Sequence, residues 1–456
     1  MGTTIAAIAT PLAAGGISVL RISGDEAIAV AGRVFAPFRH ASLEELGGYM
    51  AAYGRFLDRE GPVDDGIALV YRAPESYTGE DVVELSCHGG VYVTQRVLRL
   101  LLEQGAVLAG PGEFTKRAFL NGKLSLTQAE SVMDLIGSKN EQAMRSARAQ
   151  MDGALFRRIA GIREELLALS GHLAAWVDYP EEEIEEVETG SLSASLRHCR
   201  EKLCGLLDTF DTGKMLREGI ETAIVGRTNA GKSTLMNLLS GCEKSIVTDI
   251  AGTTRDVVEE TVRLGSAVLR LADTAGIRQT GDVVEQQGVS LAKRRIATAG
   301  LVLAVFDYSR TISEDDRQIV DLIRESGVPA LAVINKTDLD QKIDESYIQD
   351  NFQQFVYTSA EDPDSLARLT EAIETLLRVK ELDPSGGILV NERQRQCTLQ
   401  AGQALEEALG ALESGITLDA VTVLIEQALG ALLELTGDRV TDQVVDQVFS
   451  QFCVGK

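Results

Sequence analysis

The segment that most constrains the fold runs from Gly226 to Ser233 and reads GRTNAGKS. It matches the pattern G-x-x-x-x-G-K-[ST], follows an apolar β-type run at 222–225 and precedes a stretch of helical periodicity. In such a loop the glycines let backbone N–H groups point inward at phosphate oxygens, beside the positive end of the following helix. We therefore expect a phosphate site here, in which Lys232 reaches the β- and γ-phosphates and the Ser233 hydroxyl binds Mg²⁺.

Residues 219–378 alternate apolar, β-branched runs with helical stretches. The expected strands are 222–225, 268–271, 301–306, 330–334 and 355–357. Alternation of this kind is typical of a parallel sheet wound from βαβ units. The segment is therefore predicted to be an α/β domain with the phosphate loop after its first strand.

Further short motifs follow the phosphate loop in a fixed order. Asp273-Thr274-Ala275-Gly276 comes after a strand, where an acid can hold the magnesium shell and a glycine can sense the γ-phosphate. Between these two motifs, Gly252-Thr253-Thr254 supplies Thr254 as a candidate switch threonine that closes on Mg²⁺. Ser359-Ala360, after the last strand, is placed to touch the guanine oxygen.

Base selection is predicted from Asn335-Lys336-Thr337-Asp338, which ends the strand that begins at 330. Asp338 can accept hydrogen bonds from the ring N–H and the exocyclic amine of guanine, whereas adenine offers neither donor in that geometry. A buried acceptor left unpaired costs about 1 to 3 kcal/mol, so the site should select GTP. The predicted GTP-binding residues are Asn229, Ala230, Gly231, Lys232, Ser233, Thr234, Thr248, Asp249, Ile250, Ala251, Gly252, Thr253, Thr254, Asp273, Thr274, Ala275, Gly276, Asn335, Lys336, Asp338, Ser359 and Ala360.

Hydrolysis needs a group that orients water and a charge that neutralises the phosphates. The residue after Gly276 is Ile277, which has no hydrogen-bonding group, so another residue must position the water. Asn229, inside the phosphate loop, can help to hold a monovalent cation, or it can simply cap the loop. The residues alone leave both roles open.

The remainder of the chain divides into one mixed segment and two helical ones. Residues 3–118 read as short strands broken by glycine-rich turns, with at least one helix near 93–103, which is typical of an α+β domain. Helical periodicity runs from about 115 to 178 and returns from 392 to 456. Because neither helical block has an obvious end of its own, we expect the two to pack together with the α/β domain inserted between them.

Composition limits the partners and the compartment. The chain has 44 Lys and Arg against 68 Asp and Glu, a formal charge of −24, so nonspecific coating of nucleic acid is not expected. Its cysteines form no C-x-x-C pair, which suits a reducing cytosol. No uncharged apolar run approaches the ~18 residues of a membrane span, and the first basic residue, Arg21, comes too late for a secretory signal. We expect a cytoplasmic protein with no membrane partner.

Short motifs outside the nucleotide segment are more specific. They are Ala9-Thr10-Pro11, Gly15-Gly16, Arg21-Ile22-Ser23-Gly24, Tyr77-Thr78-Gly79-Glu80-Asp81, Cys87-His88-Gly89-Gly90, Pro111-Gly112-Glu113-Phe114, Arg117-Ala118-Phe119-Leu120-Asn121 and the final Phe452-Cys453-Val454-Gly455-Lys456. In this combination the chain resembles the tRNA-uridine modification GTPase family (MnmE, also called TrmE), essentially from end to end.

This resemblance implies a multidomain fold of α/β plus α+β class. An N-terminal α+β folate-binding and dimerisation domain is expected at 1–118. A helical domain is expected in two parts, at 119–218 and at 379–456, the second ending in the Cys motif. A Ras-like P-loop GTPase domain, expected at 219–378, is inserted in it.

The resemblance also implies a potassium-activated GTPase whose G domains meet across their nucleotide faces in a homodimer. The acid that orients the attacking water matches Glu285. The implied metal ligands are Ser233 and Thr254 for Mg²⁺, and Asn229, Thr248, Ile250 and Thr253 for K⁺.

Members of this family act on tRNA with a flavin-containing partner (MnmG or GidA), in a heterotetramer. They place an aminomethyl or carboxymethylaminomethyl group at carbon 5 of the wobble uridine, and a 5-formyl- or methylene-tetrahydrofolate supplies the one-carbon unit. The implied folate contacts are Arg21, Glu84, Lys123 and Lys456. A carboxylate can accept from the pterin donors, and basic side chains suit the glutamate anion of folate.

Cys453 has two interpretations. Its thiolate could add to the neighbouring carbon of uracil and make carbon 5 nucleophilic, with Lys456 lowering the thiol pKa. It could instead be a small apolar residue that closes a helix end. The family ending favours a functional Cys453 and leaves open whether it is a nucleophile or supports the folate site.

A competing hypothesis for the whole chain is a regulatory GTPase switch without a direct role in modification chemistry. Such a switch has no use for the predicted folate contacts or for Cys453. These residues therefore discriminate between the two functions.

Overall fold

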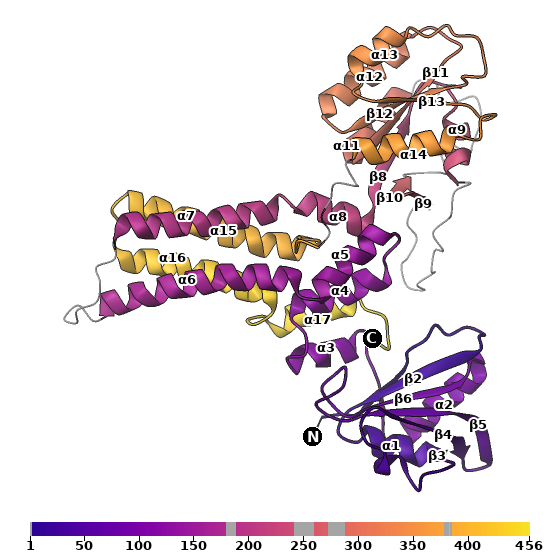
Figure 1. The fold of residues 1–456 in the computed structure, drawn as a ribbon, viewed down its shortest axis with the longest axis vertical. Coiled ribbons are helices and arrows are strands. Elements are labelled where there is room, and N and C mark those ends of the chain that lie inside the picture. Colours follow the sequence, from indigo (N-terminus) through magenta and orange to yellow (C-terminus); the bar gives the residue numbers. More distant parts are fainter. Residues whose placement is uncertain (1, 179–187, 241–259, 272–287, 378–382, 384) are drawn as a thin grey trace. The chain divides into compact units, whose positions relative to one another are not determined.

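The computed structural model describes residues 2–178, 188–240, 260–271, 288–377, 383 and 385–456 (Figure 1). The chain forms two compact units, and each is described by itself. The first unit comprises Met1–Met133, Gln150–Cys204 and Gln396–Lys456, and the second comprises Asp134–Ala149 and Gly205–Arg395. The bounds of the four segments expected from the sequence stay a prediction.

The N-terminal part of the first unit is a seven-stranded sheet in the order β3-β4-β5-β6-β2-β1-β7. Its strands are β1 (Ile5–Ile8), β2 (Ile17–Ser23), β3 (Phe35–Pro37), β4 (Met50–Asp58), β5 (Gly61–Tyr71), β6 (Val82–His88) and β7 (Val107–Leu108). All neighbours are antiparallel except β1 and β7, which pair in parallel. The expected α+β class is confirmed.

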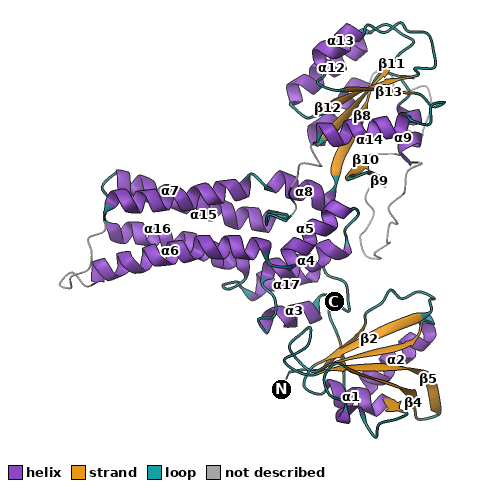
Figure 2. Ribbon diagram, in the orientation of Figure 1, coloured by secondary structure: helices purple, strands orange, loops and turns teal. Residues whose placement is uncertain are grey.

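One face of this sheet is covered by helices α1 (Ala27–Val34) and α2 (Val91–Glu103) (Figure 2). Successive side chains in a strand point to opposite faces of the sheet, so Phe56 and Leu85 lie in the core beneath these helices. The opposite face keeps large apolar side chains exposed, among them Tyr53 at 60% and Ile67 at 46%, which are cross-strand partners.

The rest of the first unit is helical. Its helices, some of which extend beyond the unit, are α3 (Glu113–Leu120), α4 (Leu126–Ile136), α6 (Ala154–Asp178), α7 (Thr189–Leu207), α15 (Glu392–Glu413), α16 (Leu418–Thr436) and α17 (Asp442–Ser450). Helices α6 and α16 pack along each other. A core of Leu126, Val132, Val445, Phe449 and Phe452 joins the middle of the sequence to its end. The expected packing of the two helical blocks is therefore confirmed.

The second unit contains a six-stranded sheet in the order β13-β12-β11-β8-β10-β9, in which only β9 is antiparallel to its neighbour. Its strands are β8 (Ile220–Val225), β9 (Glu260–Leu264), β10 (Ala267–Leu271), β11 (Leu301–Asp307), β12 (Ala330–Asn335) and β13 (Phe355–Thr358). The five expected strands are present, and the structure adds β9. This confirms the predicted α/β sheet, which lies in the sequence between helices α7 and α15 of the helical part.

Helices cover both faces of this second sheet. The covering helices are α9 (Lys232–Ser240), α11 (Gly288–Thr298), α12 (Glu314–Ser326), α13 (Glu345–Asn351) and α14 (Ser365–Leu376). The second unit also contains α8 (Phe210–Glu218) and most of α5 (Glu141–Met151). Helices α9 and α14 contribute to one apolar core, whereas α11, α12 and α13 contribute to the core on the other face. The central strand β11 is buried along its whole length, as expected for a parallel sheet covered on both sides.

Within the described ranges, no helix combines the length and the apolar character needed to cross a membrane.

Candidate functional site

The phosphate loop lies between the end of β8 and the start of α9, as the motif predicts. Gly226 has φ +152° and Gly231 has φ +105°, backbone conformations that L side chains rarely adopt. A Cβ at Gly231 would stand 1.9 Å from Asn335 Nδ2, and one at Gly226 would stand 2.4 Å from the Val305 carbonyl oxygen. The loop can therefore lie against β11 and β12 only because glycine occupies both positions.

Lys232 is folded into this loop. Its ammonium donates to the carbonyl oxygens of Gly226 and Arg227, both at 2.7 Å. Burial lowers the pKa of Lys232, the charge of Arg295 lowers it further, and Asp316 opposes the shift. The ammonium is thus held where a polyphosphate chain would meet it, and an anion there would favour its charged form.

The predicted guanine side forms a cavity of about 260 Å³ at the ends of β12 and β13. It is lined by Asn335, Thr358, Ser359 and Ala360, and by Thr234, Leu235, Asn237 and Leu238 of α9. The Asn335 amide donates to the Ala230 carbonyl at 3.4 Å, which ties the base-reading strand to the phosphate loop. The Asp338 carboxylate is exposed and accepts from the Ser359 hydroxyl at 2.6 Å. The structure therefore brings these predicted contacts together.

The first turn of α9 carries Ser233 and Thr234, both exposed. Several other predicted positions lie outside the described residues. They are Thr248, Asp249, Ile250, Ala251, Gly252, Thr253, Thr254, Asp273, Thr274, Ala275, Gly276 and Glu285.

A second cluster lies in the first unit, where β2 and β6 pair Arg21 with Glu84. The guanidinium donates from Nη2 and Nε to Glu84 Oε1, at 2.7 and 2.9 Å. It lies over the rings of Tyr77 and Phe114, whose centroids are 5.5 and 5.7 Å from Arg21 Cζ. Such a half-buried ion pair between aromatic rings offers donors, an acceptor and flat apolar surfaces at one place.

The end of the chain packs against this cluster. The backbone N–H of Gly112 donates to the Cys453 carbonyl and that of Phe114 to the Lys456 carbonyl. A Cβ at Gly455 would meet the Ile8 carbonyl oxygen at 2.5 Å, so the tail approaches β1 closely. Burial lowers the pKa of Lys456, the Arg21 charge lowers it further, and Glu84 and Cys453 oppose the shift.

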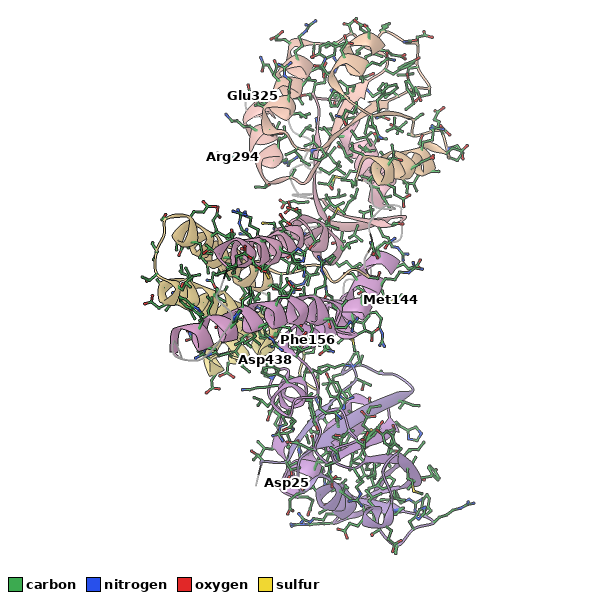
Figure 3. The ribbon with its side chains drawn as sticks, turned by 60° about the vertical axis from the view of Figure 1, so that its left-hand side comes forward. Asp25, Met144, Phe156, Arg294, Glu325 and Asp438 are labelled. Carbon is green, nitrogen blue, oxygen red and sulfur yellow. The ribbon has the colours of Figure 1, made fainter. Side chains whose placement is uncertain are left out.

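Lys123 makes its contacts elsewhere. Its ammonium donates to the Pro74 carbonyl at 3.0 Å. The residue also lines a cavity of about 850 Å³ between the ends of α3 and α16, whose lining includes Phe156 and Asp438 (Figure 3). Of the four predicted folate contacts, the structure thus gathers Arg21, Glu84 and Lys456, and gives Lys123 separate partners.

Comparisons with known proteins cover nearly the whole chain. A protein named tRNA modification GTPase MnmE from Lactobacillus delbrueckii subsp. bulgaricus is 42% identical over 458 residues, which span 99% of this chain and 98% of that protein. Proteins of the same name from Bacillus mycoides and Bacillus subtilis are 41% and 40% identical, over 99% of this chain and 99% and 100% of their own lengths. The chain belongs to the MnmE family.

Two models of the family match in order. One described as "GTP-binding protein TrmE N-terminus" matches residues 4–123, and one described as "MnmE helical domain" matches 126–453. Among solved structures, a variant of Era from Aquifex aeolicus bound to GDP and AlF₄⁻ is similar with a TM-score of 0.26 at 27% identity, over 41% of this chain and 66% of that one.

The motifs did not predict every residue around these MnmE-type sites. Tyr77 and Phe114 belong to two of the family motifs, but no local pattern indicates that their rings contact Arg21. Asp307, which pairs with Arg227 of the phosphate loop and with Lys336 directly after β12, was not predicted, and no role was predicted for Arg227. An acidic residue at the end of an otherwise apolar strand was the one available signal for Asp307.

Proposed function

We propose that this MnmE-family chain hydrolyses GTP and acts in tRNA modification. The observation that carries the proposal is the contact of the phosphate loop with the guanine-side strand, where Gly231 and Ala230 meet Asn335. The phosphate loop and the Asn335 end of β12 are thereby close enough to bind the phosphates and the base of one nucleotide. The four segments 1–118, 119–218, 219–378 and 379–456 are part of this proposal.

The nucleotide would be held by groups that the fold already fixes. Backbone N–H groups of the loop and the N-terminus of α9 face the phosphates, and Lys232 adds a cation. Asp338 reads the guanine edge, and Ser359 holds its carboxylate. Mg²⁺ would be bound by Ser233 and Thr254, and it neutralises charge on the β- and γ-phosphates when it is bound.

Potassium activation is part of the proposal. The ion would be held by Asn229 together with Thr248, Ile250 and Thr253, and it supplies the positive charge that an arginine finger supplies in other GTPases. Asn229 fits this role because it is exposed and has φ +63°, a left-handed conformation that Lys336 helps to hold through the Asn229 carbonyl. Glu285 would orient the attacking water.

The Arg21 cluster supports the folate chemistry. Glu84 can accept from a pterin, Tyr77 and Phe114 can flank its ring, and Lys456 can meet an anionic tail. Lys123 would contact the same cofactor, a tetrahydrofolate derivative that brings the one-carbon unit for carbon 5 of the wobble uridine. Cys453, half-buried beside Lys456, is the proposed nucleophile or support. A regulatory switch alone would not need this cluster.

The proposal includes a homodimer and a flavin-containing partner (MnmG or GidA) in a heterotetramer, in the cytoplasm. The uncovered face of the N-terminal sheet supports the dimer. Ile17, Tyr53 and Ile67 are 70%, 60% and 46% exposed there. Apolar surface of this kind marks protein interfaces more often than solvent-facing sheet.

Nucleoside mass spectrometry of tRNA tests the function in cells. Cells that lack this gene should lose the modified wobble uridine, and the wild-type gene should restore it. A gene carrying Lys232→Ala should not restore it, because the phosphates lose their cation. Unchanged modified nucleosides in the deletion strain would contradict the role in tRNA modification.

A further inference from the structure

A cluster of buried charges lies behind the phosphate loop. Asp307, the last residue of β11, is 3% exposed, and its Oδ1 accepts from the Ser309 backbone N–H at 3.0 Å and the Ser309 hydroxyl at 2.7 Å. Its Oδ2 accepts from Lys336 Nζ at 2.7 Å. Burial acts to raise the pKa of Asp307, but the Lys336 and Ser309 donors outweigh it and lower the pKa overall. The carboxylate is therefore charged at neutral pH.

Lys336 links Asp307 to the phosphate loop. Its ammonium, held by Asp307, also donates to the Asn229 carbonyl oxygen at 2.8 Å. Asn229 has φ +63°, a conformation that a non-glycine residue keeps only when its surroundings hold it there. The Asp307 carboxylate thus acts on the loop through one intervening side chain.

Arg227 is the second cation of the cluster. Its side chain is only 12% exposed, with Nη2 3.9 Å from Asp307 Oδ2 and Nη1 3.8 Å from Asp316 Oδ2. Asp316 belongs to the capping box of α12, where it exchanges hydrogen bonds with Ser313. The phosphate loop is therefore connected to the ends of β11 and β12 and to the start of α12.

We infer that Asp307 is a positioning residue that fixes the phosphate loop for nucleotide through Lys336 and Arg227. Without its charge, the largely buried Arg227 and the part-buried Lys336 lose a shared counterion, and a buried cation without its counterion is unstable. Arg310, 3.9 Å from Asp307 Oδ2, is 62% exposed and can turn to solvent. Lys336 then turns toward solvent and releases the Asn229 carbonyl. This inference rests on the proposed function only in that the loop binds a guanine nucleotide.

Release of a fluorescent GDP analogue from the full-length chain, followed by stopped flow, tests this role. Asp307→Asn keeps the side-chain size and an acceptor for Ser309 but removes the charge. We expect release to be about tenfold faster, as for loss of one charged hydrogen bond. The matched control is Asp321→Asn on α12, where the carboxylate is exposed and pairs with Arg324, and it should release GDP at the wild-type rate.

A second variant changes Arg227, the cation of this cluster that belongs to the phosphate loop. Arg227→Met should also release GDP faster, and the double variant should be less affected than the product of the two single effects, because both act through one cluster. If Asp307→Asn does not fold, the test rests on Arg227→Met alone. Release of the GDP analogue from Arg227→Met at the wild-type rate would then overturn the inference.

Two outcomes separate this inference from the proposed function. Wild-type protein that fails to bind the GDP analogue would contradict the proposed function itself. Wild-type protein that binds it, with folded Asp307→Asn releasing it at the wild-type rate, would overturn only the positioning role. A lower melting temperature with an unchanged release rate would show a purely structural role and would also overturn it.

Discussion

At the scale of single residues, the structure explains why particular side chains stand where they do. Glycine is required at 231 because a Cβ would overlap the Asn335 amide. At 161, within α6, a Cβ would meet nothing within 4 Å. The same chemical change is therefore expected to have opposite effects at the two positions.

Gly231→Ala should abolish or strongly weaken guanine-nucleotide binding, by about a hundredfold or more, because φ +105° and the Asn335 contact both exclude the methyl group. Gly161→Ala should leave binding unchanged and stabilise the protein by about 0.5–1 kcal/mol. Titration with a fluorescent GTP analogue and urea unfolding measure the two effects. Wild-type affinity in Gly231→Ala would contradict the loop geometry.

His88 provides a pH-dependent prediction. Its Nδ1 lies 2.6 Å from Asp64 Oδ1, and this hydrogen bond raises the pKa of the exposed imidazole. A raised native pKa means that the pair stabilises the fold below the ordinary pKa of about 6.5 and loses this effect as pH rises through the native pKa. Asp64→Asn should return the His88 pKa to about 6.5 in an NMR titration. An unchanged pKa in this variant would show that Asp64 is not the cause.

At the scale of elements, buried strands were easier to predict than half-exposed ones. Strands β11 and β12 are apolar up to their last residues, and β8 ends in an apolar run, because helices cover both faces of the sheet. All three were predicted from the sequence. Strands β3 and β7 have three and two residues, too few to show an alternation. Three of the first five residues of β4 are small, namely Ala51, Ala52 and Gly54, and this weakens the apolar alternation of the strand.

The candidate sites divide in the same way. The phosphate loop and the Asn335 motif could be predicted because each is a local sequence pattern with a local geometry. The pairing of Arg21 with Glu84, 63 residues apart, depends on the register of β2 with β6 and was not predicted. The family resemblance implied both residues only as folate contacts. Nothing local in the sequence indicated that Asp307 would meet Lys336.

Helix capping offers a test at this scale. Ser313 caps α12 through the backbone N–H of Asp316, whereas Asp364 stands at the N-cap of α14 without a side-chain cap hydrogen bond. Ser313→Ala should therefore cost about 1 kcal/mol of unfolding free energy, and Asp364→Ala should cost close to none. Urea denaturation measures both. Equal losses in the two variants would contradict the assigned cap.

At the scale of the whole molecule, the candidate nucleotide site lies in one unit and the Arg21 cluster lies in the other. The C-terminal tail contributes to the second site by packing against β1 and the loop before α3. The proposed homodimer would use the uncovered face of the N-terminal sheet. That assignment concerns surface side chains, so it can be tested without disturbing either core.

Ile67→Asp should weaken self-association by about a hundredfold or more, because it would place a charge within the proposed apolar interface. The control is Leu167→Asp, since Leu167 is 52% exposed and belongs to helix α6 rather than to the sheet. Sedimentation velocity across a concentration series measures the association. Ile67→Asp with wild-type association would place the dimer interface elsewhere.

The rate of GTP hydrolysis in KCl and in NaCl at equal ionic strength tests the central claim most directly. Asn229 and its partner ligands should hold the larger ion well and the smaller one poorly, so the account predicts turnover at least about tenfold faster in K⁺. Lys232→Ala should hydrolyse little in either salt, and ATP should be a poor substrate for the wild type. Equal wild-type rates in the two salts would contradict potassium activation, and hydrolysis of ATP as fast as GTP would contradict the assigned guanine site.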